Sequence, residues 1–166
     1  TDASVWADLA NNLSDLDTLL SDEPYYPRLT AFFRSIFQPT ATRIGWDARV
    51  RERHLDALLR STVLRQLGIY NDEATINEAR LRFAKYMEDP TNVHPDIRGV
   101  VFSLAAKGGN HSTAELMWRL QRTATLEEEK VRFLVALCHF EQHELLAETL
   151  QRSLSTEVRA HDTITM

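Results

Sequence analysis

The chain has 166 residues, of which 43% are apolar and 26% are charged, with a formal charge of −5 at pH 7. This length suits one compact domain with a buried core, and we expect a single helical-repeat domain over residues 1–166. The negative charge argues against nucleic-acid binding, which relies on a basic surface that neutralises phosphates. No run approaches the roughly 18 apolar residues of a membrane span, so no membrane partner is expected either.

The first third of the chain predicts three helices. Apolar residues recur at spacings of three and four over residues 4–20, the pattern of a helix with one buried face. A second helix is expected to begin at Pro27 and to kink or end at Pro39. A third is expected over residues 55–67, with Gly68 as its stop.

The remainder predicts five more helices. Asn71 or Asp72 is expected to cap the fourth, Pro95 to open the fifth, and Ser112 or Thr113 to cap the sixth. The sixth is expected to bury Leu116, Leu120 and Ala124. The seventh begins with three acids at 127–129, where the helix dipole favours them. The eighth is expected over about 141–154, and a further element is expected to start near 155.

Eight helices in four antiparallel pairs define the expected all-α fold. The odd-numbered helices begin at intervals of 46, 45 and 31 residues, a loose helical-repeat spacing. We therefore expect an α-solenoid of the HEAT or armadillo kind, in which each pair buries its apolar face on the next. A plain helical bundle is the competing arrangement.

No set of residues predicts catalysis or metal binding by this chain. The run from Cys138 to Glu144 contains His139 and His143, but the H-E-x-x-H pattern of zinc peptidases is missing because Glu141 does not directly follow the first histidine. No Ser-His-Asp set can be placed from the spacing. Neither catalytic residues nor metal ligands are therefore expected, and no cofactor is expected within these residues. The lone cysteine fits a reducing compartment, so a cytoplasmic location is expected.

Several ordered stretches carry a resemblance to a known family. They are Val5-Trp6-Ala-Asp8-Leu9, Ile44-Gly45-Trp46-Asp47, His54-Leu-Asp-Ala-Leu-Leu-Arg60, Ala79-Arg80-Leu-Arg82-Phe83, Pro95-Asp96-Ile97-Arg98, Glu127-Glu128-Glu129-Lys130 and Leu154-Ser-Thr-Glu157-Val158-Arg159-Ala-His161-Asp162-Thr163. In this order they resemble part of the C-terminal helical domain of the puromycin-sensitive aminopeptidases, which are zinc metallopeptidases of the gluzincin type. The resemblance spans essentially the whole chain.

The resemblance implies a non-catalytic module of a larger enzyme that removes N-terminal residues from peptides. In that family the zinc, the only cofactor implied, is held by earlier domains, and the helical domain encloses the active-site cavity and helps bind the peptide. The implied partners are the catalytic domains of the same polypeptide and peptide substrates. A free-standing α-solenoid scaffold that binds a protein in its groove is the alternative function, since enzymes and scaffolds share such folds.

Three arginines in the family-matching stretches are the candidate substrate-binding residues. Arg60, Arg98 and Arg159 would pair with the carboxylate of a peptide, because a guanidinium binds carboxylates through two parallel hydrogen bonds. Alternatively, Arg98 and Arg159 tie neighbouring helices together through Asp96 or Asp162.

Overall fold

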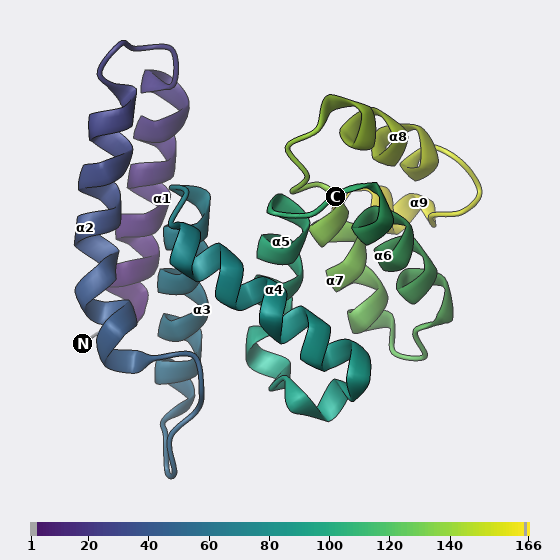
Figure 1. Cartoon of the computed structure of the whole chain (residues 1–166), viewed down its shortest axis with the longest axis horizontal. Helices are drawn as coiled ribbons and strands as arrows, with labels where there is room; N and C mark the ends of the chain where they lie inside the picture. Colours follow the sequence, from purple (N-terminus) through teal and green to yellow (C-terminus); the bar gives the residue numbers. More distant parts are fainter. Residues whose placement is uncertain (1–2, 165) are drawn as a thin grey trace. The chain divides into compact units, whose positions relative to one another are not determined.

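The structure is a computed structural model that describes residues 3–164 and 166, and within these residues it contains helices and no strands (Figure 1). The all-α class, with helices packed in antiparallel pairs, is confirmed. None of the described helices is both long enough and apolar enough to cross a membrane. The helices are α1 Ala3–Leu20, α2 Tyr26–Ile44, α3 His54–Ile69, α4 Glu73–Glu88, the 3-10 helix η1 Pro90–Asn92, α5 Pro95–Lys107, α6 His111–Thr123, α7 Glu127–Leu137, α8 His143–Ser153 and α9 Ala160–Thr163.

The chain divides into two compact units. The first comprises the described residues up to Thr75 together with His94–Ile97, and the second comprises Ile76–Val93 and the described residues from Arg98 onward. In the first unit, α1, α2 and α3 pack on one another, and α1 and α2 lie side by side (Figure 1). In the second unit, α6 and α7 form a closely packed pair.

Aromatic side chains fill the core of the first unit. The ring of Tyr70, at the end of α3, lies 5.0 Å from Phe33 and 6.2 Å from Phe37 between ring centroids, and Trp6 of α1 lies 5.7 Å from Phe37. Phe33, Phe37 and Tyr70 are almost completely buried. These contacts join all three helices, because a large aromatic side chain removes more apolar surface from water than any other residue type.

Two helix ends in the first unit differ from the sequence-based expectation. Pro39 lies inside α2, which continues to Ile44. Proline removes only one backbone donor, and the buried residues beyond it hold the last turns against the core. Gly68 lies inside α3, where it is buried, and the left-handed residue that ends the helix is Asn71, with φ 60°. Asparagine tolerates this conformation better than most residues, so it replaces glycine at the stop.

The second unit has its own aromatic core. Phe102 of α5 lies at its centre, with its ring centroid 4.8 Å from Tyr86 of α4 and 4.5 Å from Phe133 of α7. Phe83 lies 5.7 Å from Phe102 and completes the cluster. These ring contacts pack α4, α5 and α7 against one another.

The expected cap and buried face of α6 are wrong. The N-cap is Asn110, whose side-chain oxygen accepts a hydrogen bond from the backbone N–H of Thr113 at 3.2 Å. The buried residues are Ala114, Met117, Trp118 and Gln121 instead of Leu116, Leu120 and Ala124. Burial of the large Trp118 ring sets the rotation of the helix, and the expected stripe is displaced to its half-buried flank. After α8 the next helix is α9, which begins at Ala160 rather than near residue 155.

Candidate functional site

Arg60 is buried and all of its donor nitrogens have partners. Its Nη1 and Nη2 donate to the two carboxylate oxygens of Glu52 at 2.5 and 2.6 Å, and its Nε donates to the carbonyl of Gly45 at 2.9 Å. The side chain is only 2% exposed. The Arg60 guanidinium holds the pKa of Glu52 at about 2, against an ordinary value of 4.5. The structure thus uses Arg60 to anchor the α2–α3 connection, and a peptide carboxylate would have to displace Glu52 to reach it.

Arg98 is also engaged inside its unit. Its Nη1 donates to Glu129 at 3.1 Å, and its Nε and Nη2 donate to the carbonyls of Val93 and Pro90 at 3.0 and 2.8 Å. The expected alternative partner, Asp96, is replaced by Glu129. Arg98, on α5, therefore ties the segment after α4 to α7.

The carboxylate of Glu129 accepts hydrogen bonds from several side chains. Besides Arg98 it accepts hydrogen bonds from Arg132 at 2.5 Å and from the hydroxyl of Tyr86 at 3.3 Å. Burial, and next the charge of Glu129, raise the pKa of the Tyr86 hydroxyl. A buried carboxylate with three donors is satisfied within the protein, so this cluster holds the fold together.

Arg159 is the most exposed of the three candidates, with 60% of its side chain accessible. Its Nε donates to Asp162 at 2.7 Å, and Nη2 forms an ion pair with Glu127. The hydrogen bond to Asp162 is the main cause that raises the pKa of Arg159. The expected alternative pair with Asp162 is therefore present, while the guanidinium still reaches solvent.

The histidine run does not gather into a metal site. His139 lies beyond the end of α7 and its Nδ1 lies 2.8 Å from the carbonyl of Val135, whereas His143 begins α8. Glu141 forms an ion pair with Lys107 at 3.0 Å. Across the part of the chain that the structure describes, no three His, Cys, Asp or Glu side chains converge in a way that would hold a metal ion.

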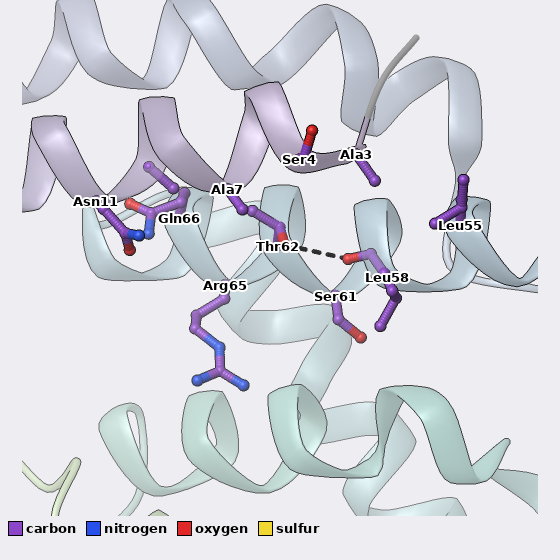
Figure 2. Close-up of a pocket in the computed structure, with 11 residues that line it drawn as sticks. Ala3, Ser4, Ala7, Asn11, Leu55, Leu58, Ser61, Thr62, Arg65 and Gln66 are labelled. Carbon is purple, nitrogen blue, oxygen red and sulfur yellow. Dashed lines mark hydrogen bonds between the residues drawn. The ribbon is translucent and has the colours of Figure 1, made fainter.

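A groove of about 490 Å³ lies between α1 and α3 (Figure 2). Its volume falls within the range of pockets that bind small ligands or peptide side chains. Small residues on α1 leave the space open, and two leucines that are about half exposed line its other side. The lining includes Ala3, Ala7 and Ala10 on α1 and Leu55, Leu58 and Thr62 on α3.

Gln66 and Arg65 are two polar side chains of this groove with hydrogen-bonding groups that no described residue uses. Gln66 is buried and its Oε1 atom has no hydrogen-bond partner, whereas the Thr62 hydroxyl is satisfied by the carbonyl of Leu58 at 3.1 Å. Figure 2 shows Arg65 at the edge of the groove with its guanidinium directed away from α1. Arg65 forms no ion pair with any described residue. The groove thus combines an apolar wall with one unpartnered amide oxygen, and the Arg65 guanidinium lies at its edge.

A second apolar recess, of about 340 Å³, lies in the second unit between α4, α5 and α6. Phe83, Met87 and Leu116 supply its apolar surface. Arg80 also lines it, and this arginine too has no ionic partner among residues 3–164 and 166. The stem of Arg80 runs close to Gly108, because a Cβ built on that glycine would lie 3.1 Å from the Arg80 Cδ.

Sequence reasoning missed Arg65 and Arg80. Arg80 stands in a family-matching stretch, Ala79–Phe83, but nothing in its spacing distinguishes it from the arginines that the fold uses internally. What distinguishes Arg65 and Arg80 from those arginines is that no acidic side chain among the described residues pairs with them. This depends on the positions of residues distant in sequence.

A model of the family described as "ERAP1-like C-terminal domain" matches residues 1–166. The chain is 38% identical to Aminopeptidase M1-A of Oryza sativa subsp. japonica over 142 residues, which is 82% of this chain and 16% of the relative. It is 33% identical to Aminopeptidase M1 of Arabidopsis thaliana over 138 residues, 80% of this chain and 16% of the relative. With the Puromycin-sensitive aminopeptidase of Caenorhabditis elegans the identity is 27% over 128 residues, 76% of this chain and 14% of the relative.

The resemblance noted in the sequence is thus confirmed for the C-terminal domains of M1 aminopeptidases in general, and the puromycin-sensitive enzyme is a more distant relative. The chain spans about a sixth of the length of the plant relatives, 16% in each case. Its all-α architecture and the match over its full length lead to one conclusion: the chain belongs to the ERAP1-like C-terminal domain family of M1 aminopeptidases.

Proposed function

We propose that this chain is a non-catalytic part of a zinc-dependent aminopeptidase, in which it encloses the active-site cavity and helps hold the peptide substrate. Zinc binding and removal of the N-terminal residue are assigned to the catalytic domains of the same polypeptide, which are its main partners. A cytoplasmic location is part of the proposal. The family match supports the parent activity, because the relatives are named aminopeptidases.

One observation carries the peptide-holding role: each compact unit has an apolar recess lined by an arginine that lacks an acidic partner within the described residues. These arginines are Arg65 in the α1–α3 groove and Arg80 in the recess of the second unit. A peptide presents apolar side chains and carboxylates together, and a guanidinium without an internal partner binds a carboxylate without first losing another ion pair.

The three candidate substrate-binding arginines of the sequence analysis have two different roles in this proposal. Arg60 and Arg98 stabilise the fold and do not contact the peptide, because their donors are occupied by Glu52 and Glu129. Arg159 keeps a direct peptide contact as its proposed role, since its side chain is largely exposed.

The test measures kcat/KM of the full-length enzyme for a long peptide and for a dipeptide substrate. Arg65→Ala and Arg80→Ala should each lower kcat/KM for the long peptide by about tenfold or more, since a hydrogen bond to a charged group contributes about 1.5–3 kcal/mol. The dipeptide should be cleaved as before. Arg119→Ala is the matched control, because Arg119 is exposed on α6 and also forms no ion pair with a described residue.

Equal losses on the long and short substrates would contradict the peptide-holding role of these two arginines. The 166-residue chain alone, supplied with zinc, should hydrolyse neither substrate. Peptidase activity of the isolated chain would overturn the assignment of catalysis to other domains.

A further inference from the structure

We propose that the connection between α2 and α3, residues 45–53, is a preformed docking surface for an acidic polypeptide segment. This segment of the chain, termed here the arginine loop, extends past the ends of the two helices (Figure 1). The inference goes beyond the proposed peptide-holding function, because the loop contributes to neither the α1–α3 groove nor the recess of the second unit.

The arginine loop is held in one conformation by contacts from inside the first unit. Oε2 of Glu52 accepts hydrogen bonds from Nη2 of Arg60 at 2.6 Å and from the backbone N–H of Arg49 at 2.8 Å. The carbonyl of Gly45 accepts from Arg60 at 2.9 Å. Gly45 and Arg51 both have positive φ, 69° and 64°, and a non-glycine residue such as Arg51 rarely adopts such a conformation. A loop fixed in this way loses little conformational entropy when a partner binds.

The loop carries a positive charge in an acidic protein. The arginine loop and its flanks, residues 43–60, contain five arginines and three acids, although the whole chain has a formal charge of −5. Glu52 is neutralised from the inside by Arg60, and Asp56 is paired with Arg53 at 3.3 Å. The guanidinium of Arg49 donates to a backbone carbonyl, which carries no charge, and Arg51 has no ionic partner among the described residues. Arg49 and Arg51 therefore offer positive charge to a partner.

The shape of the loop adds an apolar contact beside these charges. Val50, between the two arginines, is 96% exposed, and a recess of about 260 Å³ lies between the loop and the end of α2. An acidic segment with an apolar side chain would place carboxylates on the arginines and the apolar group against Val50.

A polypeptide fits this surface better than a lipid bilayer or a nucleic acid. A single exposed apolar residue contributes little insertion energy into a membrane. Non-specific nucleic-acid binding relies on an extended basic surface, whereas this chain has a formal charge of −5 and the arginine loop is a single short segment.

The experiment measures fluorescence anisotropy of a labelled peptide of repeated Glu-Glu-Leu units as the 166-residue chain is added. Binding should weaken as salt is raised, and the double variant Arg49→Ala/Arg51→Ala should weaken it by about tenfold or more. Val50→Glu keeps every arginine and should also weaken binding, because it adds a negative charge at the tip. The double variant Arg28→Ala/Arg119→Ala removes the same charge from exposed positions elsewhere and should change binding less than about twofold.

Three results would overturn the proposal: equal weakening by the control variant, equal binding of a peptide with Gln in place of Glu, or no binding by the unmodified chain. Capture of the chain by phosphatidylserine vesicles that depends on Arg51 would assign the loop to a membrane instead. Circular dichroism and thermal unfolding of each variant distinguish lost binding from lost folding. No catalytic step is measured, so the result does not depend on the proposed function.

Discussion

Arg60 and Glu52 form a two-pronged ion pair in which Nη1 lies 2.5 Å from Oε1 and Nη2 lies 2.6 Å from Oε2. Their side chains are 2% and 10% exposed, so the pair is almost closed to water. Because Arg60 stands on α3 and Glu52 in the connection before it, the pair fixes where α3 begins relative to the end of α2. Its energetic role is directly measurable.

Removing one partner of this pair should destabilise the first unit strongly. Arg60→Ala leaves the Glu52 carboxylate without its main donor, and breaking a buried pair in this way typically costs about 3–5 kcal/mol. Urea unfolding followed by circular dichroism should therefore show a lower free energy of unfolding. The exposed control Arg119→Ala should stay within about 0.5 kcal/mol of the unmodified chain. A loss of the same small size for Arg60→Ala would show that the pair does not stabilise the fold.

The same pair predicts a particular dependence of stability on pH. The pKa of Glu52 is about 2 in the folded protein and 4.5 ordinarily. The unfolded chain therefore takes up a proton at this group at higher pH than the folded chain does. The stabilisation is complete above pH 4.5 and is lost as the pH falls towards 2. Glu52→Gln cannot titrate, so its unfolding free energy should fall less steeply in this window. Parallel curves for the two proteins would contradict the assignment.

Gly109, just after the end of α5, and Gly99, inside α5, should respond oppositely to substitution by alanine. A Cβ at Gly109 would lie 2.8 Å from the carbonyl oxygen of Ala105 and 2.9 Å from the ring of Phe140, whereas a Cβ at Gly99 meets nothing within 4 Å. Gly109→Ala should destabilise by about 1–3 kcal/mol, because backbone atoms would have to move. Gly99→Ala should stabilise by about 0.5–1 kcal/mol, because alanine is the better helix former. Thermal unfolding of both variants checks the sign of each effect.

The cap of α6 can be tested by a pair of neighbouring substitutions. Asn110→Ala removes the oxygen that accepts from the backbone N–H of Thr113 and should cost about 1 kcal/mol. Ser112→Ala removes a hydroxyl that only donates to Asn110, at 2.7 Å on the surface, and should cost less. Denaturant midpoints of the two variants give the order. A larger loss at Ser112 would restore the cap expected from the sequence.

Helix positions were predictable because apolar spacing of three and four depends only on neighbours in sequence. The residues at which helices end were harder to predict. At Pro39 and Gly68 the local preference for a stop is outweighed by burial of the residues that follow, and that burial depends on packing against other helices. The predicted buried face of α6 was wrong for a related reason. It was assigned from the spacing of the leucines, whereas the structure buries the face that carries Trp118.

The roles of the arginines could be predicted only where the partner is close in sequence. Arg159 and Asp162 are one helical turn apart, and their pair was an expected alternative. Arg98 instead reaches Glu129, which is 31 residues away. Whether an arginine is free for an external ligand is decided by such distant acids, and this explains why Arg65 and Arg80 could not be recognised beforehand.

The convergence of Arg98, Arg132 and Tyr86 on the carboxylate of Glu129 has a consequence for reading genetic variants. An inherited change at any one of these four positions leaves charged or polar groups stranded in the interior of the second unit. The protein would then be less abundant, because quality-control proteases remove a misfolded product. The harm would lie in the quantity of folded protein rather than in any surface that contacts a ligand.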